Sequence, residues 1–74
     1  MKNKRIIHMP YAKFKGWLRE NNMTYKDIAN LIGNSVATVS AKINGQSDFS
    51  LAEINIIISR YDLDFSIFFT NNVA

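Results

Sequence analysis

The chain contains no cysteine, and it has a single histidine among its 74 residues. Without cysteine, neither a disulfide bond nor a thiolate-bound zinc ion can stabilise so short a chain. The histidine, His8, has no partners in the nearby sequence that would complete a metal site, so we expect a solvated side chain near the amino terminus. Stability must therefore come from one domain whose helices pack efficiently.

Long apolar runs are absent as well. No segment approaches the length of a bilayer-spanning helix, and the apolar pair Ile6-Ile7 after the basic start is too short for a signal peptide. The sequence also has no phosphate-cradling glycine loop, no clustered carboxylates and no set of nucleophile, base and orienting group. We therefore expect a soluble, cytoplasmic protein that is not an enzyme and has no cofactor or bound metal.

Acidic residues are scarce in the first two thirds of the chain. Up to Ser47 there are eight lysine and arginine residues and two acidic ones, whereas from Asp48 onward one arginine stands against four acidic residues. The first part therefore attracts a polyanion and the last part repels it. A solubilising surface on which charges cluster by chance is the alternative explanation.

The spacing of apolar residues predicts one all-α domain of five short helices over residues 10–70. A basic arm (1–9) precedes this domain, and a short tail (71–74) follows it. A strand is the competing prediction for the β-branched stretch Ile54–Ser59. This stretch lacks two-residue alternation and follows a Ser-x-x-Glu capping signal, so we predict a helix there.

Capping residues mark the ends of the predicted helices. Pro10 suits the first position of the first helix, and Gly16 within that helix is explained most simply by the close approach of another helix. Each later helix is preceded by a residue suited to an N-cap; these residues are Thr24, Ser35, Ser50 and Asp64. Gly33 and the pair Asn44-Gly45 are expected to end two helices in the left-handed conformation.

The stretch from Thr24 to Gly45 places two short helices around a turn that contains glycine. This is the layout of a helix-turn-helix, whose second helix enters the major groove of DNA. The geometry needs a small residue where the helices cross, a turn residue with positive φ, and an apolar anchor on the second helix. Ala29, Gly33 and Val39 have these properties.

The segment "MTYKDIANLIGNSVATVSAKINGQ" resembles the helix-turn-helix of the lambda-repressor and Cro family (XRE-type) of phage and bacterial regulators. The matching positions are Met23, Thr24, Tyr25, Ile28, Ala29, Gly33, Ser35, Thr38-Val39-Ser40 and Asn44-Gly45. The later "SDFSLAEINIIISRYDLDFSIFF" resembles the fourth and fifth helices of that family, so the resemblance covers Tyr11 to Phe69. It implies a compact five-helix lambda-repressor-like DNA-binding domain.

The chain departs from the family at three positions of the motif. Tyr25 and Val36 stand where the family often has glutamine, and valine cannot form the bidentate pair that glutamine makes with adenine. Lys42 stands where an apolar residue is usual, with Ile43 expected to take over the packing. These changes leave no basis for transferring the base preference of the family.

The resemblance also implies which residues contact DNA. The residues expected at base edges are Val36, Ala37, Thr38, Ala41 and Lys42. Small apolar groups there touch thymine methyls, while Lys42 reaches guanine or a phosphate. The residues expected at phosphates are Thr24, Tyr25, Lys26, Ser35, Asn44, Gln46 and Ser47.

Several of these residues have a purely structural alternative. Val36 shares a stripe with Val39 and Ile43, which would place it in the core. Thr24 and Ser35 are also helix caps, and Asn44 also suits a left-handed C-cap.

Two further features bear on DNA binding and assembly. The basic residues of the arm, Lys2, Lys4 and Arg5, either follow DNA into a minor groove or form a tail without a role. The large apolar residues of "FSIFF" and Ile56–Ile58 are expected first of all in the core. A single small core cannot hide so many of them, which favours a homodimer.

These observations and the resemblance predict a sequence-specific regulator of transcription that binds double-stranded DNA, a Cro-type repressor of a phage or prophage. A homodimer would occlude a pseudo-palindromic operator in the host-cell cytoplasm or nucleoid, with no small-molecule ligand and no membrane partner. The alternative is a helical protein-interaction module of antitoxin or anti-repressor type. The few hydrogen-bond donors on the second motif helix favour this alternative.

Overall fold

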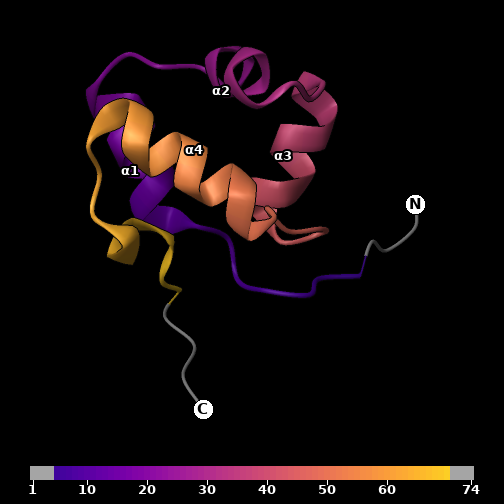
Figure 1. The fold of residues 1–74 in the computed structure, drawn as a ribbon. Helices are drawn as coiled ribbons and strands as arrows, with labels where there is room; N and C mark the ends of the chain where they lie inside the picture. Colours follow the sequence, from indigo (N-terminus) through magenta and orange to yellow (C-terminus); the bar gives the residue numbers. More distant parts are fainter. Residues whose placement is uncertain (1–4, 71–74) are drawn as a thin grey trace.

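The computed structural model describes residues 5–70, which form four α-helices and one short 3₁₀ helix (Figure 1). The elements are α1 (Ala12–Glu20), α2 (Tyr25–Ile32), α3 (Val36–Asn44), α4 (Leu51–Tyr61) and η1 (Phe65–Phe68). No strand occurs within this range, so the predicted all-α class is confirmed and Ile54–Ser59 is helical. Lys2 and Lys4 of the predicted arm and the predicted tail (71–74) lie outside the described residues.

The fifth predicted helix is a single 3₁₀ turn. The carboxylate of Asp64 accepts a hydrogen bond from the N–H of Ser66, 2.8 Å away, and the N–H of Ile67 donates to the carbonyl of Asp64 at 3.0 Å. This three-residue spacing is that of a 3₁₀ helix. Asp64 is thus the predicted cap, although the helix that it opens has only four residues.

The predicted caps of α2 and α4 are reciprocal capping boxes. In α2, the hydroxyl of Thr24 accepts from the N–H of Asp27 (3.3 Å), and the Asp27 carboxylate accepts from the N–H of Thr24 (2.8 Å). Ser50 and Glu53 form the same pair of bonds at 3.1 and 3.0 Å. Each box uses two N–H groups that a helix cannot pair by itself.

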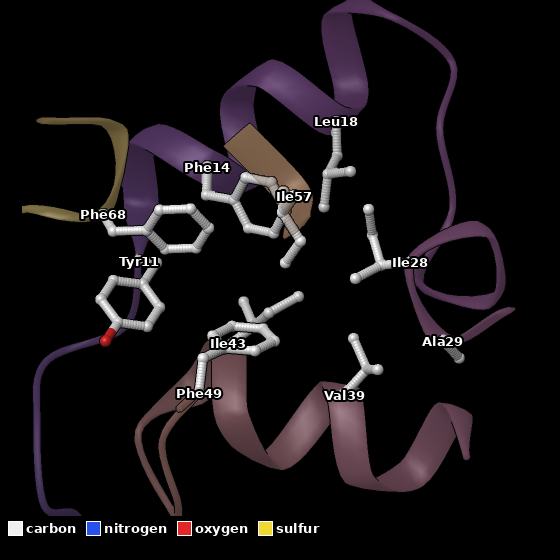
Figure 2. Close-up of a cluster of buried hydrophobic side chains, with 10 residues drawn as sticks. All are labelled: Tyr11, Phe14, Leu18, Ile28, Ala29, Val39, Ile43, Phe49, Ile57 and Phe68. Carbon is white, nitrogen blue, oxygen red and sulfur yellow. The ribbon is translucent and has the colours of Figure 1, made fainter. Parts of the chain in front are cut away.

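The core brings together side chains from every element (Figure 2). Its ten buried residues are Tyr11, Phe14, Leu18, Ile28, Ala29, Val39, Ile43, Phe49, Ile57 and Phe68. Figure 2 shows the side chains of α1 and α3 pointing toward one another, with Ile57 of α4 between them. Of the segments expected first in the core, "FSIFF" buries only Phe68 and Ile56–Ile58 buries only Ile57.

The first helix begins at Ala12, two residues after Pro10, so the predicted start was wrong. Tyr11 has φ −79° and ψ 78°, which is not helical, and its N–H donates to the carbonyl of Ile43 in α3 at 3.0 Å. Gly16 also has a different environment from the one expected. No atom of another element lies within 4 Å of the position that a Cβ would take there.

The segment before α1 lies along the loop that follows α3 (Figure 1). The N–H of Ile7 donates to the carbonyl of Gly45 at 2.7 Å, and Nε2 of His8 is 2.8 Å from the carbonyl oxygen of Ser47. The imidazole stacks on the ring of Tyr11 and is only 12% exposed. The expected solvated histidine was therefore wrong, because His8 fills the space between the start of the chain and this loop.

Gly45 ends α3 with φ +99°, and Gly33 ends α2 with φ +75°. Alanine at either position carries a left-handed cost of about 1–2 kcal/mol. At Gly45 the added Cβ would also overlap the carbonyl oxygen of His8, whereas Gly33 has open space there. We expect Gly45→Ala to lower the free energy of unfolding clearly more than Gly33→Ala, as measured by urea denaturation. Equal losses would show that His8 does not pack against Gly45.

At Gly16, replacement by alanine is expected to stabilise the fold. Gly16 lies inside α1 with space for a methyl group, and alanine is a better helix former than glycine by about 1 kcal/mol. Gly16→Ala is therefore expected to raise the free energy of unfolding by about 0.5–1 kcal/mol. The same urea titration measures it, and a decrease would mean that another side chain occupies this space.

Candidate nucleic-acid interface

The helices α2 and α3 pack against each other, and a short connection of three residues, Gly33–Ser35, joins them. The N–H groups of Gly33 and Asn34 both donate to the carbonyl of Ala29, which closes the end of α2. Ala29 is 2% exposed and Val39 of α3 is fully buried, as predicted for the small residue and the apolar anchor. These contacts fix the direction in which α3 leaves the turn.

The burial of Val39 and Ile43 sets the rotation of α3 about its axis. At 100° per residue, Ala37 and Ala41 lie on the opposite side, with Thr38 beside them. Ala37 and Thr38 are exposed, and Ala41 is half-buried beneath the loop that follows α3. Val36 lies on the same side of α3 as Val39, but in the first turn it is 46% exposed, so its alternative place in the core is excluded.

Lys42 does not share this outward surface. Its ammonium donates to both carboxylate oxygens of Glu53 in α4, at 2.8 and 3.0 Å, and to the side-chain oxygen of Asn34 at 2.9 Å. The side chains of Lys42 and Glu53 are only 14% and 19% exposed. The structure therefore places the side chain of Lys42 between α3 and α4, and its expected contact with base edges stays a prediction.

The first turn of α2 carries three residues that were expected at phosphates. The hydroxyl of Thr24 donates to the Asp27 carboxylate at 3.0 Å in addition to its capping bond. The backbone N–H of Thr24 is the main reason that the pKa of Asp27 lies below its ordinary value. Tyr25 is half-buried against the core, and Lys26 is exposed. Because the Asp27 carboxylate already faces the end of this helix, Lys26 is the stronger candidate for a phosphate contact.

The first turn of α3 differs from those of α2 and α4, because it has no acidic residue. The hydroxyl of Ser35 accepts from the N–H of Thr38 at 3.1 Å and donates to the hydroxyl of Thr38 at 2.9 Å. The partial positive charge of this helix end is therefore not opposed by a carboxylate in its own first turn. Ser35 and Thr38 remain exposed at this end.

The loop after α3 uses most of its polar groups internally. The N–H groups of Gly45, Gln46 and Ser47 all point at the carbonyl of Ala41, at 3.1, 2.9 and 3.2 Å. Gly45 alone takes the left-handed conformation, so the interpretation of Asn44 as a left-handed cap was wrong. The side chain of Gln46 is exposed, and that of Ser47 is half-buried.

Asn44 connects this loop to a lysine that the sequence analysis did not assign to the site. Its side-chain N–H₂ donates to the carbonyl of Ser40 at 2.9 Å, and its oxygen accepts from the ammonium of Lys15 at 3.0 Å. Lys15 is thereby held beside the end of α3, although 29 residues separate it from Asn44 in the chain. Its positive charge is the only sequence signal that pointed to it.

A second cluster attaches the amino-terminal segment to the same loop. The hydroxyl of Tyr11 donates to the carboxylate of Asp48, which also accepts the N–H of Phe49 at 2.8 Å. Burial raises the pKa of Tyr11, and the bond to Asp48 raises it further. The Nε2 atom of His8 lies 3.5 Å from the same carboxylate. Of the arm residues Lys2, Lys4 and Arg5, only Arg5 is within the described range, and it precedes His8 by three residues in the chain.

The described part of the chain shows neither a metal site nor a membrane-spanning helix. Within residues 5–70, no three histidine, cysteine or acidic side chains come together as a metal site requires. None of the helices in the same range is long and apolar enough to cross a membrane.

Comparison of the chain with models of protein families, with curated proteins and with solved structures finds no match.

The bond to Lys42 makes stability depend on the charge of Glu53. Hydrogen bonding from Lys42 is the largest cause that lowers the pKa of Glu53 below its ordinary value of 4.5, and burial opposes it. A lowered pKa means that the ionised group stabilises the fold above the ordinary pKa and that this contribution is lost as the pH falls through the lowered value. We expect Glu53→Gln to reduce the free energy of unfolding at about pH 6 and much less at about pH 3.

Urea titrations of both proteins at several pH values test this expectation. The exposed Glu20 provides the control, because Glu20→Gln removes a carboxylate that has no lysine partner among the hydrogen bonds of the described residues. If the Glu53→Gln difference did not depend on pH, the ion pair with Lys42 would make no net contribution.

Proposed function

We propose that this chain is a sequence-specific regulator of transcription that binds double-stranded DNA. In this proposal α2 and α3 act as a helix-turn-helix, with α3 in the major groove. The fold is then a lambda-repressor-like domain of the Cro type, in which η1 takes the place of the fifth helix. The protein would act as a homodimer that covers a pseudo-palindromic operator and keeps polymerase or a rival regulator from it.

The outward surface of α3 carries the proposal. Ala37, Thr38 and Ala41 lie on it with short side chains, and Val36 is exposed in the first turn, so the helix axis can come close to base edges. From Ile28 to Ser47 the chain has no acidic residue, and its one charged residue, Lys42, is paired with Glu53. Nothing on this surface therefore repels DNA, while valine and alanine methyls suit contacts with thymine methyls.

Phosphate contacts are assigned to the residues around this surface. Lys26 and Gln46 have exposed side chains, and Lys15 lies beside the end of α3. The unopposed first turn of α3 adds the backbone N–H groups that follow Ser35. Such contacts supply affinity without sequence information, whereas the face of α3 supplies the discrimination.

Exposed apolar side chains support the homodimer. Four large ones remain between 44% and 66% exposed after α3: Leu51, Ile56, Phe65 and Phe69. Phe65 and Phe69 contact each other edge to face, with ring centres 5.8 Å apart. A monomer leaves these side chains in water, and a second copy that packed on them would remove them from it.

One observation favours the alternative function as a protein-interaction module. The exposed part of α3 carries no net charge, because Glu53 neutralises Lys42. Its side chains are short, and those of Val36 and Ala37 are apolar. Such a surface also suits the apolar face of a partner helix. The two functions differ in whether a duplex of defined sequence is bound.

Two alanines allow a matched test of the DNA-binding surface. Ala37 and Ala52 are each exposed and each the second residue of a serine-capped helix, α3 and α4. Replacement by glutamate changes the net charge by the same amount at both positions and places the new carboxylate in the first turn of a helix in each case. We expect Ala37→Glu to weaken binding to the preferred duplex at least about tenfold, while Ala52→Glu stays within about twofold.

The preferred duplex comes first from selection out of a random DNA pool. A palindromic sequence with half-sites about one helical turn apart is expected, and its preference should persist at higher salt. Fluorescence anisotropy then measures both variants on it. If no sequence emerged and all binding disappeared with salt, the proposal would be overturned in favour of the interaction module. Equal losses for the two variants would remove α3 from the interface.

A further inference from the structure

The contacts of Lys42 hold its ammonium inside the fold. An ammonium has three donors and no acceptor. In this structure it has three partners within 3.0 Å: the two carboxylate oxygens of Glu53 and the side-chain oxygen of Asn34. These bonds hold the ammonium against Glu53 and Asn34, and the side chain of Lys42 is only 14% exposed.

These partners come from different elements. Asn34 lies in the turn between α2 and α3, Lys42 in the last turn of α3, and Glu53 in the first turn of α4. Glu53 also accepts the N–H of Ser50, so the same carboxylate caps α4 and holds α3. Through Lys42, one small network therefore links the turn before α3 and the last turn of α3 to the start of α4.

The network complements the apolar contacts of α3. Val39 and Ile43 fix the buried side of the helix but are short and non-directional. Directed bonds from a largely buried lysine add a constraint on rotation and on tilt, since each oxygen accepts only within a limited range of angles. Ala37 and Ala41, on the opposite side of α3, are positioned by this constraint.

We propose that Lys42 is a positioning residue of the DNA interface. It acts through Glu53 and Asn34 to hold α3 at the angle that base contacts require, and it does not itself contact DNA. This inference rests on the proposed function, and it assigns to Lys42 a role different from that of a lysine that binds guanine or phosphate.

The dependence of affinity on salt separates these two roles. Each phosphate neutralised by a lysine adds about 0.9 to the slope of log K against log salt concentration. Loss of a positioning residue weakens binding at every salt concentration and leaves the slope unchanged. The exposed Lys26 provides the matched control, because Lys26→Met removes the same charge from a residue assigned to phosphate.

Two variants of the network are compared, and the second of them keeps the net charge. Lys42→Met leaves the Glu53 carboxylate without its partner. The double variant Lys42→Gln with Glu53→Gln keeps the net charge, lets an amide donate to residue 53 and to Asn34, and retains an acceptor for the N–H of Ser50. Binding of both variants to the selected duplex is measured over a series of salt concentrations, with thermal unfolding of each protein alongside.

Lys42→Met is expected to bind roughly tenfold more weakly, in the range seen for residues coupled in one hydrogen-bond network, with the slope of the unmodified protein. The double variant is expected to regain most of this affinity, and Lys26→Met to lose about one unit of slope. If the double variant lost about one unit of slope, or if Lys42→Met bound as well as the unmodified protein, the inference would be overturned. The double variant decides the matter alone should Lys42→Met fail to fold.

Failure of the proposed function has a different signature. If the unmodified protein bound no duplex with sequence preference, DNA binding itself would be overturned, and the positioning role would fall with it. A loss of slope in the double variant on a selected duplex would overturn only the role of Lys42.

Discussion

The burial of Val39 and Ile43 is the constraint on which the rest of the structure depends. Both side chains are fully buried, and they are the only residues of α3 that are. Their place in the core fixes the rotation of a helix of nine residues, which is too short to hold its conformation alone. With that rotation set, the alanines of α3 face outward and Lys42 meets Glu53 on the flank. Two apolar side chains thus determine which residues of α3 face outward and which contact α4.

The parts of the fold that follow local rules were predictable from the sequence. The capping pairs Thr24/Asp27 and Ser50/Glu53 are three residues apart, so their geometry depends on one helical turn and on nothing distant. The same holds for Gly33, whose positive φ only a few residues tolerate. The residue types on the outward side of α3 were also predictable, since the period of a helix relates each of them to Val39.

Contacts across the chain were not predictable in this way. Lys15 bonds to Asn44 and His8 reaches Ser47, across 29 and 39 residues, and both depend on how whole elements pack. The role of Lys42 was missed for a related reason. Glu53 was already assigned as a capping residue, and a sequence pattern does not reveal that one carboxylate serves two purposes. Likewise the core selects Phe68, which packs on Tyr11 and Phe14, and leaves its neighbours in "FSIFF" without full burial.

The acidic residues from Asp48 onward repel DNA less than their number alone indicates. Glu53 is bonded to Lys42, Asp48 to the hydroxyl of Tyr11 and Asp64 to the N–H of Ser66, so three of the four carboxylates make hydrogen bonds inside the fold. In the proposed complex these bonds leave α3 neutral, while exposed Lys26 and the nearby Lys15 provide the positive charge around it. Salt would then weaken the contacts of the surrounding residues and spare those of α3, because methyl contacts release no counterions. A protein built in this way gains discrimination relative to non-specific binding as the salt concentration rises.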